Sequence, residues 1–172
     1  NRTITVGPGV INLRITEHVN ADGYHYAPDP SSQKACTIGG NVAENAGGPH
    51  TLKYGVTVNH VLGLEMVLAD GELVTLGANH FGQPGPDLLG LVTGSEGTFG
   101  IITKITCRLM PNPEKAVTML GIYKSVREAC ESVSNIIGQG IIPAALEMLD
   151  KTMIYAVEKA LKPGFPLDAE AV

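Results

Sequence analysis

Apolar residues recur with two different spacings in the first two thirds of the chain, and the spacing distinguishes strands from helices. Thr3–Val6 alternates β-branched residues, which is typical of a strand, whereas Ile11, Ile15 and Val19 recur at helical spacing. Asp87 precedes a short apolar run and is a suitable N-cap for a helix. The expected strands cover residues 3–6, 61–69, 72–76 and 101–109, the expected helices cover residues 11–19, 41–46 and 88–92, and a polar loop covers residues 79–86.

Two of the expected strands form a hairpin. The runs 61–69 and 72–76 flank Asp70-Gly71, a dipeptide that favours the tight turns of β-hairpins. The later run, 101–109, alternates along its length and is therefore expected to bury one face. That face comprises Ile101, Thr103, Ile105, Cys107 and Leu109.

A proline-rich linker at residues 111–113 divides the chain. Beyond it, strand-like runs at 117–123 and 144–149 alternate with helix-like runs. This β-α-β-α order is typical of half of a ferredoxin-like unit. The sequence therefore predicts an α+β fold, with one domain over residues 1–113 and the beginning of a second over residues 114–172.

Both helices of the second domain have recognisable start signals. Ser125 and Glu128 form a capping box, and Asp150 is an N-cap. Each helix then carries an apolar stripe that a core could cover. The first stripe comprises Val126, Ala129, Cys130, Val133, Ile136 and Ile137, and the second comprises Ile154, Val157 and Leu161.

Charge is spread along the chain rather than gathered into patches. The 12 basic and 17 acidic residues give a formal net charge of −5, and no basic face for nucleic acid or anionic lipid is visible. The chain has no tryptophan, three phenylalanines and five tyrosines, which leaves few rings on which bases could stack. We therefore expect no nucleic-acid partner.

Cysteine usage and hydropathy favour a reducing compartment. Cys36, Cys107 and Cys130 are odd in number and have no CxxC spacing, so neither a disulfide framework nor a zinc site is expected. No apolar run approaches the roughly 20 residues of a membrane span, and no signal peptide is present, which predicts a cytoplasmic location. The chain has no initiator Met and no closing signal after Val172, which predicts an internal piece of a longer protein.

Residues 28–48, PDPSSQKACTIGGNVAENAGG, combine a stiff loop with two glycine pairs. Two prolines fix φ at the start of the loop. The pairs Gly39-Gly40 and Gly47-Gly48 let another group come close to the main chain. The start of the expected helix between the pairs would offer unpaired N–H donors to a phosphate or a polar ring edge. A single pair could form a tight structural turn, but the whole constellation favours a ligand cradle.

Residues 94–100, GSEGTFG, place a glycine at every third position. A P-loop ends in Gly-Lys-Ser/Thr, which is absent, and a Rossmann fingerprint opens a helix, whereas here a strand follows. Two interpretations remain. The turn either brings backbone N–H and C=O groups against a flat or phosphorylated group, or needs small residues for packing. This motif alone does not decide between them.

Taken together, the motifs resemble a known family. Tyr26-Ala-Pro-Asp-Pro-Ser-Ser, TIGGNVAENAGG, LKYG, the Asp-Gly hairpin and GSEGTFGIIT are similar to the FAD-binding fold of the vanillyl-alcohol-oxidase (PCMH) type. The similarity is to the branch of the bacterial glycolate oxidases and related D-2-hydroxy-acid dehydrogenases, and extends to GIIPAALEMLD near the end of the chain. It implies the C-terminal part of a PCMH-type FAD-binding domain, followed by the start of a ferredoxin-like substrate cap domain.

The resemblance implies that FAD is the cofactor and that two segments of this chain contact it. The flavin would carry the redox chemistry, and the protein would orient and tune it. The first segment would lie along the flavin ring, ribityl chain and pyrophosphate, and the second would approach the rest of the dinucleotide through its backbone. The first comprises Pro28, Asp29, Pro30, Ser31, Cys36, Thr37, Gly39, Gly40, Ala43, Asn45, Ala46 and Gly47, and the second comprises Glu96, Gly97, Gly100, Ile101 and Ile102.

Other parts of the family's machinery are expected outside this segment. The resemblance places a glycine-rich pyrophosphate loop before Asn1, and a substrate-binding arginine, a catalytic histidine and metal-binding histidines after Val172. Catalytic residues therefore stay unassigned, and no metal site is expected here. His50 could face the flavin or be a solvated loop histidine, and we prefer the second interpretation.

Three interpretations of function follow. The first is a piece, inactive alone, of an FAD-dependent oxidoreductase that oxidises a 2-hydroxy acid such as glycolate or D-lactate by hydride transfer to flavin N5. The second is a truncated module that holds no cofactor. The third is another flavin enzyme of the same fold, such as a cell-wall sugar reductase that uses a nicotinamide. The resemblance further implies partner oxidase subunits, one of them an iron–sulfur protein, and membrane association only through such partners.

Overall fold

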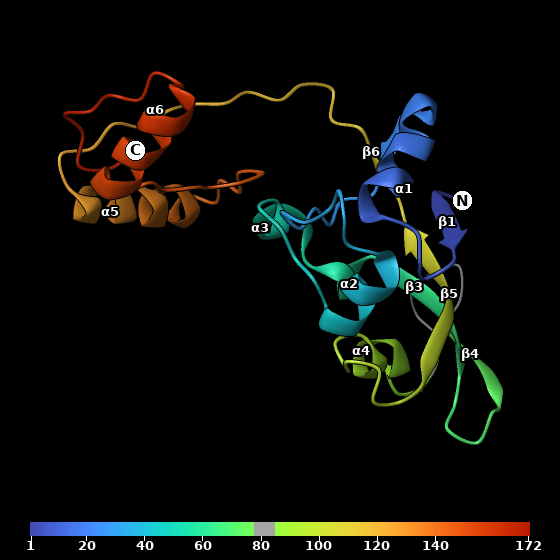
Figure 1. Ribbon diagram of the computed structural model, residues 1–172. Helices are drawn as coiled ribbons and strands as arrows, with labels where there is room; N and C mark the ends of the chain where they lie inside the picture. Colours follow the sequence, from blue (N-terminus) through green and yellow to red (C-terminus); the bar gives the residue numbers. More distant parts are fainter. Residues whose placement is uncertain (78–84) are drawn as a thin grey trace. The chain divides into compact units, whose positions relative to one another are not determined.

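The computed structural model describes residues 1–77 and 85–172 and contains two compact units, Asn1–Pro113 and Glu114–Val172 (Figure 1). Helices occur in both units, and the sheets lie in the first. The α+β class expected from the sequence is therefore confirmed. The loop expected at residues 79–86 lies almost entirely outside the described residues.

An antiparallel four-stranded sheet forms the centre of the first unit. The strands of this unit are β1 (Thr3–Val6), β2 (Tyr24–His25), β3 (Val61–Val67), β4 (Leu73–Gly77), β5 (Ile101–Arg108) and β6 (Met110–Pro111). The sheet has the order β1-β5-β3-β4, and β2 and β6 form a separate two-stranded ribbon. The N-terminal strand thus pairs with β5, with Ile4 opposite Cys107.

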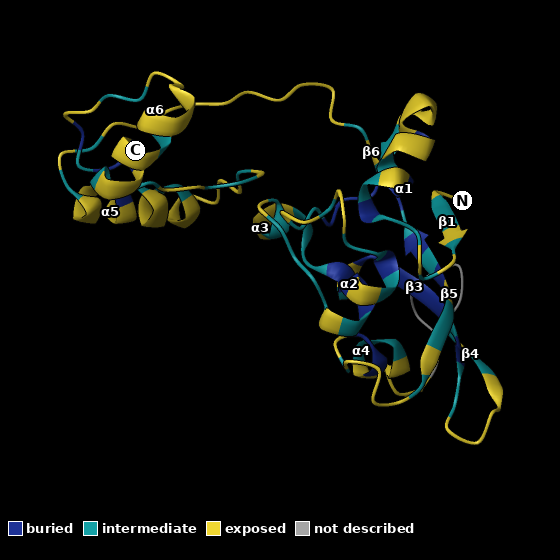
Figure 2. Ribbon diagram, viewed as in Figure 1, coloured by how far each residue is buried: buried dark blue, intermediate teal, exposed yellow. Residues whose placement is uncertain are grey.

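The described part of the first unit has four helices, of which all but α3 contribute side chains to the core around this sheet. They are α1 (Asn12–Val19), α2 (Ile38–Glu44), α3 (Thr51–Tyr54) and α4 (Leu88–Val92), with 3-10 turns at Asn20–Asp22 and Thr57–Asn59. Ile15 of α1 and Ile38 and Val42 of α2 are at most 1% exposed and share one cluster with Leu64 and Ile105. Figure 2 shows this buried layer along β3, β5 and α2. Full burial of each such side chain stabilises the fold by about 1.5–3 kcal/mol.

The expected hairpin forms, and Asp-Gly lies at its turn. β3 pairs with β4 from Val67–Leu73 onward, and Gly71 has a φ of 87°. Asp87 caps α4 as expected, because its side chain accepts from the Gly90 N–H. These features depend on residues close in sequence, which the pattern records directly.

The expected buried face of β5 is only partly correct. Cys107 is fully buried, but Ile101 is 73% exposed. The register between β5 and β3 shifts between Glu65 and Met66 of β3. A bulge of this kind reverses the faces of the side chains that lie beyond it in the ladder. Ile102, rather than Ile101, therefore packs against the core. The expectation of a buried face that begins at Ile101 is wrong.

Both expected helices of the second unit form with their expected caps. They are α5 (Val126–Gly138) and α6 (Lys151–Leu161). The Ser125 side chain accepts from the Glu128 N–H at 3.2 Å, and Asp150 caps α6 in the same way. The Glu128 carboxylate accepts from the N–H of the residue before Ser125, so the second arm of the capping box reaches one residue further out.

The strands expected at 117–123 and 144–149 do not form in the part of the chain that the structure describes. Only isolated bridges occur there. Ala171 pairs with Tyr123, the last residue of the first run, and with Asp150, the residue after the second run. Every residue from 113 to 122 is exposed. A strand needs a neighbouring segment for its N–H and C=O groups, and no described segment lies beside this run.

The core of the second unit is small. Ile154 is fully buried and packs with Ala169 and Val172. Of the apolar stripe expected on α5, only Ala129 is buried. None of the helices in the described ranges has the length and apolar composition of a membrane-spanning segment.

Candidate cofactor-binding site

A pair of buried asparagines connects the Pro28 loop to α2. The Asn12 side-chain amide donates to the Pro28 carbonyl at 3.0 Å, and the Asn41 amide donates to Asn12 Oδ1 at 2.8 Å. Asn12 is 1% exposed and Asn41 is 4% exposed. Each buried amide left without a partner would cost about 1–3 kcal/mol, so this relay fixes the loop firmly against the helix.

The start of α2 does not offer the unpaired donors that the sequence suggested. The N–H groups of Ile38 and Gly39 donate to carbonyls of the loop after β1 at 2.8 and 2.9 Å, and the Gly40 N–H donates to the Thr37 hydroxyl at 3.2 Å. A Cβ atom on Gly39 would lie 2.6 Å from Pro8 Cβ. Gly39 is therefore needed for close packing inside the chain, and the expectation of unpaired N–H donors at this helix start is wrong.

The end of α2 joins the glycine-rich loop at residues 94–100. Gly94 N donates to Val42 O at 2.8 Å, and Glu96 N donates to Ala43 O at 3.0 Å. Asn45 and Glu96 both have left-handed backbones, with φ of 52° and 54°. Such conformations cost energy for residues other than glycine and cluster at functional sites. The two glycine-rich segments are therefore direct neighbours.

Free backbone donors remain at this junction. In the 94–100 loop, the N–H groups of Ser95 and Thr98 bond to nearby carbonyls, but those of Gly97 and Phe99 find no acceptor among the described residues. The Gly47 N–H, just beyond α2, is also free in the described chain. Amides presented by a turn with positive φ bind anions and polar ring edges. These groups, rather than the start of α2, fit a diphosphate-bearing flat ligand.

A short turn after α3 fixes the segment that follows α2. The backbone N–H and the hydroxyl of Thr57 both donate to the Ala46 carbonyl, at 3.0 and 2.7 Å. The Val58 N–H donates to the Asn45 side chain at 2.9 Å. Thr57 is fully buried. No sequence motif marks Asn12 or Thr57, because each acts on a segment distant in the chain.

Asp29 and His50 connect the proline loop to the turn after α2. His50 Nδ1 lies 2.5 Å from Asp29 Oδ2, and the His50 backbone N–H donates to Asp29 Oδ1 at 3.4 Å. A Cβ atom on Gly48 would overlap the Asp29 backbone carbonyl. The His50 side chain is 44% exposed. His50 is thus half-exposed, as the preferred interpretation held, but it is paired with a carboxylate rather than solvated alone.

The remaining predicted contact residues lie on both sides of this assembly. Ser31 and Cys36 lie in the loop that leads to α2. Gly100 has a φ of 156°, and a Cβ atom there would lie 2.5 Å from a carbonyl of β3, so the close approach at this position is to the sheet. Ile101 and Ile102 begin β5. Through α2, the structure connects the proline loop with the 94–100 loop.

Several titratable side chains near the site are buried and uncharged. Burial raises the pKa of the Cys107 thiol to about 12, and burial likewise raises the pKa of Tyr26 well above its ordinary value. Burial lowers the pKa of His60, whose Nε2 donates to the Tyr54 carbonyl at 2.8 Å. The Tyr26 hydroxyl lies near Cys107 and Thr57 without forming a well-aligned hydrogen bond. These groups are suited to holding the core, and not to proton transfer.

No metal centre is visible in residues 1–77 and 85–172, where no three His, Cys, Asp or Glu side chains are placed to hold an ion.

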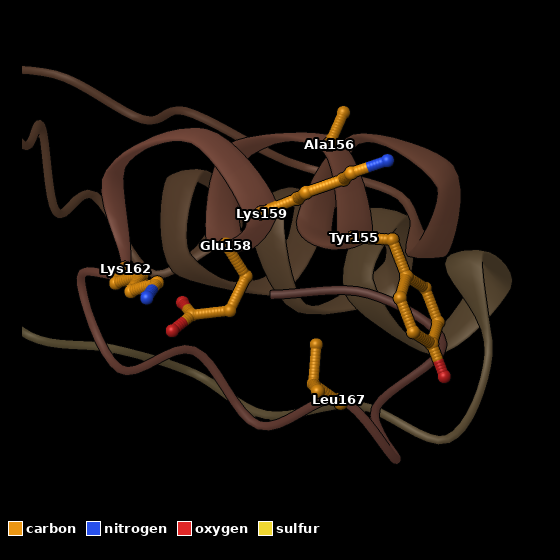
Figure 3. A pocket seen from close by; sticks show the side chains of 6 residues that line it. All are labelled: Tyr155, Ala156, Glu158, Lys159, Lys162 and Leu167. Carbon is orange, nitrogen blue, oxygen red and sulfur yellow. The ribbon is translucent and has the colours of Figure 1, made fainter.

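A cavity of about 630 Å³ lies in the second unit beside α6 (Figure 3). Lys159 and Lys162 lie on its lining but extend in different directions, and Glu158 is occupied by the N–H groups of Gly164 and Phe165. The charged groups therefore do not converge on a common point. This hollow lacks the set of convergent polar groups that ligand sites show.

Comparison with protein families gives two matches that together cover most of the chain. Residues 1–77 match the family described as "FAD binding domain", and residues 112–172 match "FAD linked oxidases, C-terminal domain". The first match contains the proline loop and α2, and the second begins at the linker.

Curated relatives align along nearly the full chain. Glycolate oxidase subunit GlcD of Escherichia coli (strain K12) is 51% identical over 99% of this chain, and GlcD of Bacillus subtilis (strain 168) is 47% identical over 100%. D-lactate dehydrogenase of Anaerostipes hadrus is 36% identical over 99%. The chain covers 34%, 37% and 36% of these proteins, and so spans about a third of their length.

Solved structures of alkyldihydroxyacetonephosphate synthase share the fold. Two crystal forms align with TM-scores of 0.75 and 0.77 at 20% identity. Each alignment covers 99% of this chain and 33% of the synthase chain. At this level of identity the similarity concerns the fold alone.

Proposed function

We propose that the chain belongs to the FAD-linked oxidases, that residues 1–113 form part of their FAD-binding domain and that residues 114–172 form the beginning of their substrate (cap) domain. Support comes from the two compact units, whose boundary falls between Pro113 and Glu114. In this proposal the first unit makes all of the contacts that this chain forms with the cofactor.

We propose that the whole protein is an FAD-dependent dehydrogenase or oxidase of a 2-hydroxy acid of the glycolate or D-lactate type. The names of the curated relatives support this substrate class. Bound FAD supplies the acceptor for the hydride that leaves the substrate α-carbon, while the hydroxyl proton passes to a base. The residues of this chain would bind and orient the cofactor, and keep its surroundings free of competing charges.

One observation carries the proposal: two hydrogen bonds join the end of α2 to the 94–100 loop. Gly94 N and Glu96 N donate to carbonyls of α2, while the adjacent Gly97 and Phe99 amides have no acceptor among residues 1–77 and 85–172. The free amides suit phosphate oxygens, and the small residues suit a flat ring. The proposed contacts are those that the resemblance implied. Thr37, Gly39 and Gly40 would contact the cofactor without donating a backbone N–H to it.

A matched pair of glycine variants tests the cofactor site. Gly97 and Gly71 have φ of 74° and 87°, and a Cβ atom at either position meets nothing within 4 Å. Alanine in this left-handed region costs about 1–2 kcal/mol at either position. Gly97→Ala should in addition displace an amide that binds a charged group, worth about 1.5–3 kcal/mol, and weaken FAD affinity about tenfold or more.

Flavin fluorescence quenching measures the affinity, and thermal unfolding measures the stability of each variant. Gly71→Ala should lose stability to a similar extent but bind FAD like the unmodified chain. Equal loss of FAD affinity in both variants would count against the 94–100 loop as a contact. Turnover of glycolate, D-lactate and D-2-hydroxyglutarate by the longest protein that contains this sequence then tests the substrate class.

A second candidate is a module that holds no cofactor by itself. The satisfied N–H groups at the start of α2 favour it, because they remove donors that a phosphate would need. A chain that leaves flavin fluorescence unchanged at every concentration would support this candidate. Quenching at micromolar concentration would reject it.

We further propose that the whole protein works in the cytoplasm with other oxidase subunits, one of them an iron–sulfur protein, and meets a membrane only through them. The word "subunit" in the names of two relatives supports an assembly. Co-purification of the whole protein with a brown, iron-containing partner would test this part of the proposal.

A further inference from the structure

A single histidine occupies both oxygens of a carboxylate in the proline loop. His50 Nδ1 lies 2.5 Å from Asp29 Oδ2, and the His50 backbone N–H donates to Asp29 Oδ1 at 3.4 Å. The Asp29 side chain is 19% exposed and the His50 side chain is 44% exposed. The carboxylate is thus mostly shielded from water, whereas the imidazole still reaches it.

The pair joins two segments that otherwise meet only through backbone contact. Asp29 stands between Pro28 and Pro30, which restrict the loop on both sides. The Asp29 backbone packs directly on Gly48, whose N–H donates to the Thr51 hydroxyl at 2.8 Å. A change at the carboxylate would therefore be transmitted to the loop and to the turn after α2 together.

The far side of the imidazole is open. His50 Nε2 has no hydrogen-bond partner among the described residues, since Asp29 engages only Nδ1 and the backbone. The Tyr54 ring lies 6.5 Å from the His50 ring, and the Lys53 ammonium and the His25 ring lie 5.4 and 5.9 Å from the Tyr54 ring. Asp29 is thus the carboxylate that contacts His50 directly.

We propose that His50 is a positioning residue of the FAD-binding segment, which acts through the Asp29 carboxylate to hold the Pro28–Pro30 loop in its binding conformation. The proposal rests on the proposed function, because the loop is one of the predicted FAD contacts. His50 itself needs no contact with the cofactor in this role.

Substitutions at His50 separate its hydrogen bond from the rest of the side chain. His50→Asn places an amide nitrogen near the position of Nδ1 and keeps the donor, whereas His50→Ala removes it. The FAD dissociation constant of each variant is measured by flavin fluorescence. His18→Ala, an exposed histidine on α1, is the control.

His50→Ala should bind FAD about three- to fivefold more weakly than the unmodified chain, as expected when a half-exposed pair is lost. His50→Asn should keep most of the affinity, because it retains the donor. His18→Ala should behave as the unmodified chain.

A readout without cofactor completes the test. Amide hydrogen exchange at His50 and Gly48 should accelerate in Asp29→Asn and His50→Ala, while the melting temperature changes little. FAD binding that is indifferent to the substitutions at His50 would overturn this inference alone. An equal loss of affinity and of melting temperature in His50→Ala and His50→Asn would reduce His50 to a structural role. Failure of the unmodified chain to bind FAD would overturn the proposed function as well.

Discussion

Asn12, Asn41 and Thr57 are buried polar side chains that each hold a carbonyl or amide group next to the candidate site. Their partners lie 16, 29 and 11 residues away in sequence, which makes each of them a tertiary contact. A buried polar group without a partner costs about 1–3 kcal/mol, so loss of any one of these contacts should destabilise the surroundings of the site. The glycines permit the close approach of segments, and these side chains determine which segments approach.

His60 provides a test of burial at the residue scale. It is 2% exposed, and burial lowers its pKa below the ordinary value of about 6.5. The unfolded chain therefore takes up this proton at a higher pH than the folded chain. Stability should be complete above about pH 6.5 and decline as the pH falls below it, by at most about 1.4 kcal/mol per pH unit.

His60→Gln keeps an Nε2 donor for the Tyr54 carbonyl and removes the titration. Urea unfolding of both proteins from about pH 7 to about pH 5, the range in which imidazoles titrate, gives the two stability curves. The unmodified chain should lose more stability across this range than His60→Gln. A constant difference between the two curves would show that His60 titrates alike in both states.

At the element scale, success in predicting structure followed sequence distance. The caps Ser125, Asp87 and Asp150 and the Asp70-Gly71 turn were correct because each interaction spans only a few residues. The expected donors at the start of α2 were wrong because the loop after β1 folds over them. No local pattern records which distant carbonyl will accept a given N–H.

In the second unit, strand-like sequence was likewise not enough to predict a strand. Residues 117–123 have strand-like composition, yet a strand is defined by its partner, and the described chain supplies only one bridge, at Tyr123. The bulge opposite Glu65 and Met66 likewise depends on how two strands meet. For the candidate site, the motifs located the two segments, but Asn12, Thr57 and the Asp29–His50 pair required the structure.

The end of α6 gives a prediction at this scale. Lys162 has a φ of 52°, and its N–H donates to the Glu158 carbonyl at 3.1 Å, so it occupies the left-handed position after the helix. Lys162→Gly should stabilise α6 by about 0.5–1 kcal/mol, because glycine adopts this conformation without strain. Lys159→Gly, inside the last turn, should destabilise it by about 1 kcal/mol. Hydrogen exchange of the α6 amides measures both, and effects of the same sign would contradict the assignment of the helix end.

At the scale of the whole molecule, the predicted cofactor contacts all lie in the first unit, Asn1–Pro113. The chain spans about a third of the length of its curated relatives. The binding half of the proposed chemistry can therefore be examined on this unit, whereas turnover belongs to the longer protein. The segment between the units then becomes the natural place to separate them.

Limited proteolysis should cut this segment first. Residues 113–122 are exposed, and none of their backbone groups is hydrogen-bonded within the described chain. Trypsin should therefore cleave after Lys115 well before Lys104, whose side chain is 60% exposed but whose backbone is paired in β5. Mass spectrometry of the early products identifies the site. Because both lysines are exposed, a difference in rate reports backbone pairing, and equal rates would mean that residues 113–122 are held in place as firmly as β5.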